Sequence, residues 1–152
     1  MQPPANLTIS PLTDATVLSQ LAAEAMADGH RMVARLIDEW ITGENRFDKP
    51  GEQSYLATLD GIVCGVCGLN IDPFAGNEKI GRVRRLYVAR AFRRRGIGSA
   101  LMQRLLTDAR GRFSELQLRT HDPIACSFYE ALGFIPVAGT TTCTHRRTLQ
   151  SE

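Results

Sequence analysis

A basic loop between an apolar stretch and an amphipathic helix is the feature that most restricts how this chain can fold. The apolar stretch runs over 80–88, and apolar residues recur at helical spacing from Ile97 onward. Seven arginines and no carboxylate lie between Arg82 and Arg95, and two glycines stand where the helix begins. A helix start offers unpaired backbone N–H groups and positive charge, and glycines let an anion approach them closely. The segment therefore predicts a strand, a loop and a helix that together bind a phosphate or pyrophosphate.

Two familiar phosphate motifs do not fit this loop. No G-x-x-x-x-G-K-[ST] sequence occurs in the chain. A dinucleotide-binding G-x-G-x-x-G sequence fails because Leu101 stands where the third glycine belongs. The glycines could also serve only a tight turn, and the arginines only a solvated face. A nucleic-acid-binding or protein-binding module that uses the arginine stretch is therefore a second interpretation at this point.

Composition favours one small globular domain over residues 1–152. Hydrophobic residues make up 43% of the chain, enough for a single core, and the net charge is only +2. The first residues do not resemble a secretion signal, and no apolar run is long enough to span a bilayer. We expect a cytoplasmic protein without a membrane partner.

Strand and helix periodicities predict elements in the order βααβββαβαββ. The dipeptide Asp60-Gly61 joins two neighbouring strands as a tight hairpin. A later crossover from 80–88 through a helix to 115–119 should make those two strands parallel. We expect an α/β (α+β) fold with a mixed, mostly antiparallel sheet and helices on both faces.

Four cysteines occur, and two of them form a Cys64-Gly-Val-Cys67 sequence. No second pair or nearby histidine follows at metal-site spacing, and the pair lies inside an apolar strand pattern instead of before a helix. Residues three apart on a strand point to opposite faces of the sheet. We therefore expect free thiols, no bound metal and no disulfide, as is usual in a reducing compartment.

The basic loop and a second motif together resemble a known family. Arg93-x-x-Gly96-x-Gly98, after an apolar strand and before a helix, looks like the acetyl-CoA signature of the GNAT superfamily of N-acetyltransferases. The segment 122–134, which reads Asp-Pro-x-Ala-x-x-Phe-Tyr-Glu-x-Leu-Gly-Phe, resembles the next helix of that family. The resemblance covers nearly the whole chain. It implies a sheet of about seven strands flanked by about four helices, and acetyl-CoA as cosubstrate.

The resemblance also implies which residues hold the coenzyme. In the family, the strand before the loop diverges from its parallel neighbour at a bulge, and the pantetheine bonds the exposed backbone. A backbone N–H near Val88 would then polarise the thioester oxygen. The implied coenzyme-binding residues are Leu86, Tyr87 and Val88 for the pantetheine, and Arg93, Arg94, Arg95, Gly96, Ile97, Gly98 and Ser99 for the pyrophosphate.

Tyr129 matches the family's tyrosine that faces the coenzyme sulfur, which implies a general acid for the leaving thiolate. Two positions depart from the family pattern. Asp122 stands where asparagine is most frequent, and because an ionised aspartate offers no donor we expect it to cap the helix instead. The strand before the loop carries no carboxylate, so the general base is left open between His121, His145, water and none.

The acceptor is left open by the sequence. The resemblance implies a small-molecule or peptide amine, and lysine side chains, small amines and amino-acid derivatives all fit. Two alternatives are a GNAT-like domain that binds coenzyme without catalysis, and the Arg-rich binding module. We do not expect a nucleic-acid partner, because known nucleic-acid motifs are absent. A homodimer is left open.

Overall fold

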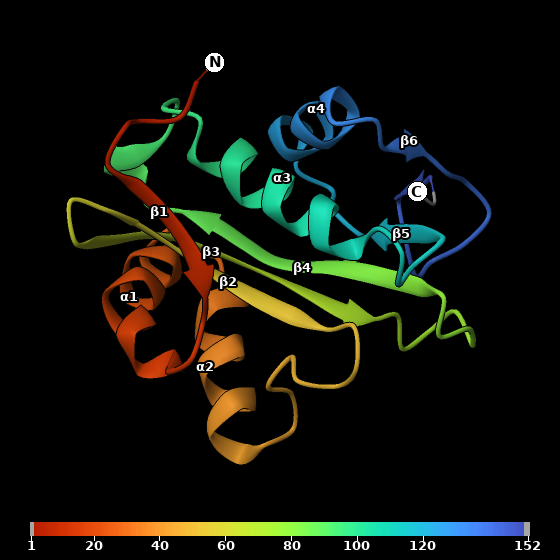
Figure 1. Cartoon of the computed structure of the whole chain (residues 1–152), viewed down its shortest axis with the longest axis horizontal. Coiled ribbons are helices and arrows are strands. Elements are labelled where there is room, and N and C mark those ends of the chain that lie inside the picture. The colour runs from red at the N-terminus through yellow and green to blue at the C-terminus, as the bar shows by residue number, and fades with distance from the viewer. Residues whose placement is uncertain (1, 151–152) are drawn as a thin grey trace.

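A seven-stranded sheet forms the centre of the molecule, and helices cover both of its faces (Figure 1). The structure, a computed structural model, describes residues 2–150; Met1, Ser151 and Glu152 of the predicted domain lie outside them. The strands are β1 (Leu7–Pro11), β2 (Gln53–Leu59), β3 (Ile62–Ile71), β4 (Ile80–Val88), β5 (Glu115–Leu118), β6 (Ile135–Pro136) and β7 (His145–Thr148). The helices are α1 (Ser19–Ala27), α2 (Met32–Thr42), α3 (Ile97–Ala109) and α4 (Pro123–Ala131), with short 3₁₀ helices at Ala15–Leu18 and Arg90–Phe92. None of these helices is long and apolar enough to cross a bilayer.

The strand order across the sheet is β1-β2-β3-β4-β5-β7-β6. β4 and β5 pair in parallel, and the helix of the crossover between them is α3. Every other neighbouring pair of described strands is antiparallel. The predicted element order and the predicted fold class are both confirmed: the sheet is mixed and mostly antiparallel.

The β2–β3 hairpin forms where the sequence predicts it. Asp60 and Gly61 both adopt positive φ, at 51° and 78°, as a two-residue hairpin turn of the primed type requires. Leu59 and Ile62 flank the turn as paired residues. The turn helps to set the register of β3, the strand on which β4 is built.

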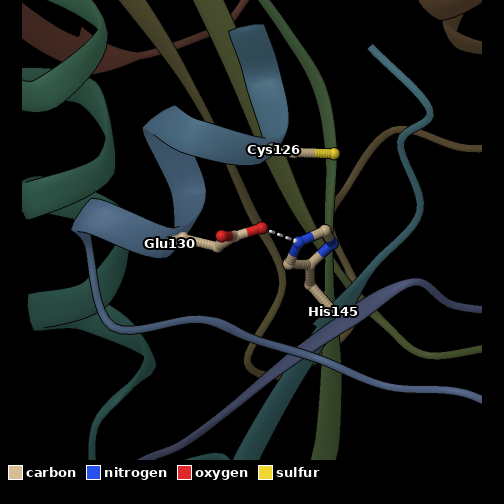
Figure 2. Close-up of side chains that lie close together, drawn as sticks. All are labelled: Cys126, Glu130 and His145. Carbon is tan, nitrogen blue, oxygen red and sulfur yellow. Dashed lines mark hydrogen bonds and ion pairs between the residues drawn. The ribbon is translucent and has the colours of Figure 1, made fainter. Parts of the chain in front are cut away.

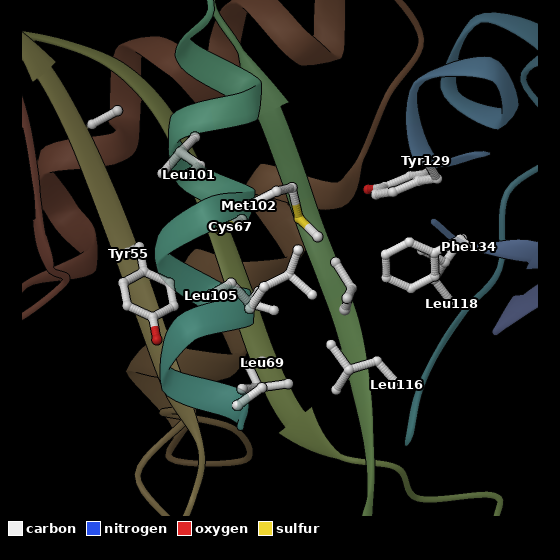
Figure 3. Close-up of a cluster of buried hydrophobic side chains, with 14 of the residues drawn as sticks. Tyr55, Cys67, Leu69, Leu101, Met102, Leu105, Leu116, Leu118, Tyr129 and Phe134 are labelled. Atoms are coloured by element: carbon white, nitrogen blue, oxygen red, sulfur yellow. The ribbon is translucent and has the colours of Figure 1, made fainter. Parts of the chain in front are cut away.

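Two hydrophobic clusters fill the layers on either side of the sheet. Leu101, Met102 and Leu105 of α3 are fully buried in the first cluster, together with side chains of α4 and the sheet (Figure 3). Val33 and Leu36 of α2 lie in the second cluster, where α1 and α2 pack on the other face. Burial on both faces explains why β3 reads as a nearly continuous apolar run.

The prediction of free thiols is confirmed, but the predicted placement of two of them is wrong. All four cysteines are free. Cys64 and Cys67 belong to the same cluster under α3, not to opposite faces. The register of β2 against β3 shifts between Ala57 and Thr58, and this irregularity brings Cys64 onto the face of Cys67. Burial raises the pKa of both thiols, which keeps them protonated and unreactive.

A glycine on β3 makes room for the loop that follows α2. A Cβ at Gly68 would lie 2.3 Å from the ring of Phe47, far inside van der Waals contact. Phe47 is 3% exposed, and its backbone N–H donates to the side chain of Asn45 at 3.0 Å. The side-chain amides of Asn45 and Asn70 bond each other reciprocally, which also joins the loop to β3. The loop at 43–52 is therefore held on the sheet by packing that needs a residue without Cβ.

Gly68→Ala should destabilise the protein, because the added methyl group must displace the Phe47 ring. Overpacking of this kind typically costs about 1–3 kcal/mol. Combining Gly68→Ala with Phe47→Leu should cost less than the sum of the two single changes, since the smaller side chain leaves the contact. Denaturant unfolding of the four proteins measures this coupling. If the two losses of unfolding free energy were strictly additive, Phe47 and the added methyl group would not compete for the same space.

Candidate functional site

β4 and β5 separate after a short parallel pairing. They pair only from Ile80 to Arg82 on β4 and from Glu115 to Gln117 on β5. β4 continues to Val88, and along this stretch it pairs with β3 alone among the described strands. Its other edge is open, so the backbone N–H and C=O groups on that edge can bond a ligand.

The backbone N–H of Val88 points into this opening. The next residue, Ala89, donates its N–H to the carbonyl of Cys64 on β3 at 2.8 Å. Val88 stands opposite Gly65, and bonded and non-bonded pairs alternate along antiparallel strands. Val88 therefore turns its polar backbone groups away from β3. Its carbonyl accepts from the Nε–H of Arg93 at 3.0 Å, which leaves its N–H as a donor at the open edge.

A bulge in β4 decides which side chains face which helix layer. Arg85 has a φ of 62°, and the register against β3 shifts at the same point. The extra residue reverses the alternation of side chains along the strand. Val83 and Leu86 both pack in the cluster under α3, although they are three residues apart. Tyr87 packs with α1 and α2, and Arg84 also lies on that side, beside Glu39 of α2.

The loop and the start of α3 present backbone donors that suit an anion. Gly96, the residue before the first turn, has a φ of 79°, and no side chain caps the helix. The bond from the Ala100 N–H to the Gly96 carbonyl, at 3.0 Å, begins the helical series. The N–H groups of Ile97, Gly98 and Ser99 precede it and are available to a ligand. The Ile97 side chain itself is buried, so only its backbone can face an anion.

Three arginines surround this helix start. Arg93, Arg94 and Arg95 are all exposed. Arg93 stacks over the ring of Tyr87 at 5.3 Å, and Arg95 over Phe92 at 5.5 Å. Among residues 2–150, none of the three forms an ion pair with a carboxylate. Positive charge without a direct ion-pair partner therefore lies beside available N–H groups, an arrangement that suits a pyrophosphate.

Tyr129 projects from α4 toward β4 (Figure 3). It is 7% exposed and meets Phe128 and Phe134 edge-on, at 5.2 and 5.6 Å between ring centroids. Its hydroxyl has no hydrogen-bond partner in the part of the chain that the structure describes. Burial raises the pKa of Tyr129, so the phenol stays protonated at neutral pH. A protonated hydroxyl without a partner is available to a ligand.

Comparison with known proteins agrees with this geometry. The family model described as the acetyltransferase (GNAT) family matches residues 17–134. The chain belongs to the GNAT acetyltransferase family. A candidate acetyltransferase from Exiguobacterium sp. 255-15 is 27% identical, with 93% of each chain covered and a TM-score of 0.81.

More distant solved structures share the GNAT fold. An acetyltransferase of the GNAT family from Staphylococcus aureus Mu50 is 16% identical, covers 95% of this chain and 99% of its own, and has a TM-score of 0.73. Ard1 from Thermoplasma volcanium is 21% identical, covers 97% and 100%, and has the same TM-score of 0.73. At these identities the likeness is one of architecture alone.

The structure brings the residues expected to serve GNAT chemistry to one place. Leu86, Tyr87 and Val88 border the open edge of β4, and the segment 93–99 forms the loop and helix start directly after it. A Cβ on Gly98 would lie 3.5 Å from Phe128 and 3.7 Å from Val88, so the helix start, α4 and the strand end meet here. Tyr129 follows Phe128 on α4. The coenzyme-binding and catalytic roles of these residues stay predictions.

Sequence analysis missed Glu24, which the structure places beside the site. Its carboxylate on α1 accepts from the Tyr87 hydroxyl at 2.5 Å and from the Arg90 N–H at 2.9 Å. The bond from Tyr87 lowers the pKa of Glu24, and burial together with this carboxylate raises the pKa of Tyr87 to about 12. Asp28, the residue directly after α1, pairs with Arg90. Because 63 residues separate Glu24 from Tyr87, spacing in the sequence carries no signal of the contact.

Asp122 caps α4, as the sequence predicts. Its side chain accepts from the Ile124 N–H at 3.0 Å, and its backbone is extended, as a residue before a helix usually is. His121, one of the candidate bases, directly precedes it and is exposed. The predicted capping role is confirmed, and a role of His121 as base stays a prediction.

His145, the other candidate base, is hydrogen-bonded to Glu130 (Figure 2) and to Thr144. Its Nε2 lies 2.9 Å from Glu130, and its Nδ1 lies 2.9 Å from the Thr144 hydroxyl, which accepts from the Thr120 N–H. Cys126 completes a group whose sulfur, oxygen and nitrogen atoms lie within 4.8 Å of one another. These residue types can ligate a metal, and sequence analysis missed the group because α4 and β7 bring it together. The hydrogen bonds occupy both ring nitrogens, and the absence of a metal stays a prediction.

The contacts of Glu24 predict how stability depends on pH. Hydrogen bonds lower the pKa of Glu24 in the folded state, so its carboxylate stabilises the fold above its ordinary pKa. This contribution is lost as the pH falls through the folded pKa. Glu24→Gln should therefore melt below wild type at neutral pH and show a smaller loss of Tm between about pH 5 and pH 3.

Tyr87→Phe is the matched variant, because the Tyr87 hydroxyl is the main cause of the lowered pKa of Glu24. It should also reduce the loss of Tm over the same pH range. The double variant should change the Tm little more than either single variant does. Melting curves that stay parallel for wild type and Glu24→Gln would contradict the role given to this carboxylate.

Proposed function

We propose that this GNAT-family protein transfers an acetyl group from acetyl-CoA to the amine of a small molecule or peptide by direct attack. The observation that carries the proposal is the Val88 N–H at the open edge of β4, next to the uncapped start of α3. The Val88 N–H offers a donor where the thioester would lie, and the start of α3 offers donors where the pyrophosphate would lie.

The residues present fit acetyl-CoA. The open backbone edge at 86–88 would hold the pantetheine, as an added strand would. The N–H groups of 97–99 and the arginines of 93–95 would hold the pyrophosphate. Gly98 supports this fit, because it leaves the space between Phe128 and Val88 free of a side chain. When bound, acetyl-CoA supplies a thioester that an amine can attack.

Two groups of the chain would act on the reacting atoms. The Val88 N–H would stabilise negative charge on the carbonyl oxygen, and a backbone donor needs no rearrangement to do so. The Tyr129 hydroxyl keeps its proton at neutral pH because burial raises its pKa. It has no competing partner among the described residues, so it can donate that proton to the leaving sulfur.

The proposed reaction needs no side chain near the open strand as general base. Two described carboxylates lie beside the open stretch of β4. Glu39 is paired with Arg85, and Glu24 already accepts two hydrogen bonds, with a lowered pKa that makes it a weak base. His145 would have to give up its contact with Glu130 or with Thr144. We therefore propose that the acceptor loses its ammonium proton to solvent and attacks as the neutral amine. The nitrogen releases a second proton to solvent as the amide forms and the C–S bond breaks, and Tyr129 regains from solvent the proton that it gives to sulfur.

The cysteines support a reducing compartment for this reaction. All four are free, and Cys64 and Cys67 are fully buried in an apolar cluster. Proteins of oxidising compartments more often pair their cysteines. We therefore propose that the enzyme works in the cytoplasm.

Acetyl-CoA and CoA should raise the Tm of the protein, because a ligand at about 100 times its Kd adds about 2.7 kcal/mol to stability. Pantetheine without phosphate should do much less, since it lacks the group that the α3 start is placed to hold. Gly98→Val should weaken CoA binding by putting a branched side chain where the phosphates approach. Thermal shift and calorimetry measure both effects.

Gly98→Ala is the control for folding, because its Cβ makes only ordinary contacts of 3.5 Å or more. The free protein should melt near wild type. If pantetheine and CoA raised the Tm equally, or if CoA at millimolar concentration left the Tm unchanged, the phosphate site would be ruled out.

Tyr129→Phe should lower kcat by at least about tenfold, because general acid catalysis is typically worth about 10²–10⁴-fold and water can substitute in part. The CoA affinity and the Tm should barely move, since the ring, its packing and the phosphate loop are kept. The three measurements are made on one variant, at an acceptor concentration where chemistry limits the rate. An unchanged kcat would remove Tyr129 from the mechanism and leave solvent as the acid.

A further inference from the structure

A pocket of about 420 Å³ opens on the α2 face of the sheet. Exposed residues of the loop after α2 form its rim, and the less exposed Asn70, Ile71 and Arg84 of the sheet form its floor. Glu39, which pairs with Arg85 at the bulge of β4, also lines it, so the pocket reaches the strand that carries the proposed reaction. The volume lies within the range of about 300–1,000 Å³ that is usual for small-molecule sites.

Arg84 brings to this pocket a positive charge that has no ion-pair partner among the described residues. Its neighbour Arg82 pairs with Asp72 at 2.9 Å, and Arg85 pairs with Glu39 at 2.9 Å. Within residues 2–150, Arg84 has no hydrogen-bond or ion-pair partner. Half-burial and the two neighbouring arginines lower the pKa of Arg84, and the charges of Glu39 and Asp72 offset this only in part, so the charge of Arg84 is disfavoured in the free protein. An anion in the pocket would relieve that cost.

The carboxylates around the pocket do not supply that anion. Glu39 is held by Arg85. Glu52 accepts from two backbone N–H groups, at 3.2 and 2.8 Å. Glu44 and Asp48 stand on the exposed rim, where solvent screens their charge. The half-buried charge on the floor is therefore left for a ligand.

We propose that the acceptor is a small amine that also carries a carboxylate, and that Arg84 binds that carboxylate. This inference rests on the proposed acetyl transfer at the open edge of β4. A guanidinium matches a carboxylate with two parallel hydrogen bonds, which fixes the orientation of the ligand as well as its charge.

The position of Arg84 along the strand fits this assignment. It lies four residues before Val88, at most about 13 Å away along an extended strand, and its own long side chain covers part of that interval. An acceptor of amino-acid size held at Arg84 can therefore direct its amine toward the thioester.

Matched pairs of acceptors test the proposal. The probes are α-amino acids, β-alanine and 4-aminobutyrate, each compared with its carboxamide, and thiol release from acetyl-CoA follows turnover. In Arg84→Gln, the ratio of kcat/KM for acid over amide should fall at least about tenfold, through a higher KM for the acid alone. Amidation also lowers the pKa of the amine. The acid-to-amide ratio of kcat/KM in Arg84→Gln is therefore compared with the same ratio in wild type.

Lys49→Gln is the control variant, because it removes the same charge from the exposed rim of the same pocket. It should leave the acid-to-amide ratio unchanged. Arg84→Gln should melt at or above the wild-type Tm and bind CoA as wild type does, since Arg84 makes no contact that folding or the phosphate loop needs.

Calorimetry on the CoA-saturated protein separates the two ways of failing. Binding of the acids that Arg84→Gln abolishes, without any turnover, would overturn the proposed transfer and support the subsite. Three other results would overturn the carboxylate subsite while the transfer stands. The first is turnover of amides or uncharged amines alone, and the second is an equal loss of kcat/KM in Arg84→Gln for the acid and the amide of each pair. The third is tighter binding of phosphoethanolamine than of the amino acids.

Discussion

β4 and β5 pair over 80–82 and 115–117 and then separate, because β4 bulges at Arg85 while β5 ends at Leu118. An open strand edge inside a sheet leaves backbone N–H and C=O groups without partners, which is unfavourable unless solvent or a ligand bonds them. The alternation of antiparallel pairs turns the Val88 backbone toward this edge. The loop after Val88 then begins α3 with no side-chain cap, so a second set of free donors follows within a few residues.

The arginines of this region divide into two kinds by their partners. Arg82 is nearly fully buried and pairs with Asp72, and removing one partner of a buried pair typically costs about 3–5 kcal/mol. Arg85 pairs with Glu39 and so ties the bulge to α2. Those of the loop at 93–95 are exposed, and their charge is available to an anion. Positive charge on one short segment thus stabilises the sheet at some positions and is available to ligands at others.

The layer of α1 and α2 is attached to the sheet by two separate contacts. Glu24 bonds Tyr87 and the backbone that follows it, so α1 cannot shift without disturbing the loop. Phe47 fills the space over Gly68 and holds the loop that rims the pocket. The proposed coenzyme edge and the proposed acceptor pocket are therefore built on the same strand but are positioned by different packing contacts.

Much of this architecture follows from local signals in the sequence. The Asp60-Gly61 turn, the cap at Asp122 and the glycine at the α3 start each depend on residues a few positions apart, and the family resemblance supplied the bulge and Tyr129. Only the tertiary structure decided the features that depend on contacts between residues far apart in the sequence. Glu24 reaches β4 across 63 residues, and an irregular register places two cysteines on one face. Arg84 is left unpaired because the available carboxylates lie against its neighbours, and no spacing in the sequence records which arginine a carboxylate will meet.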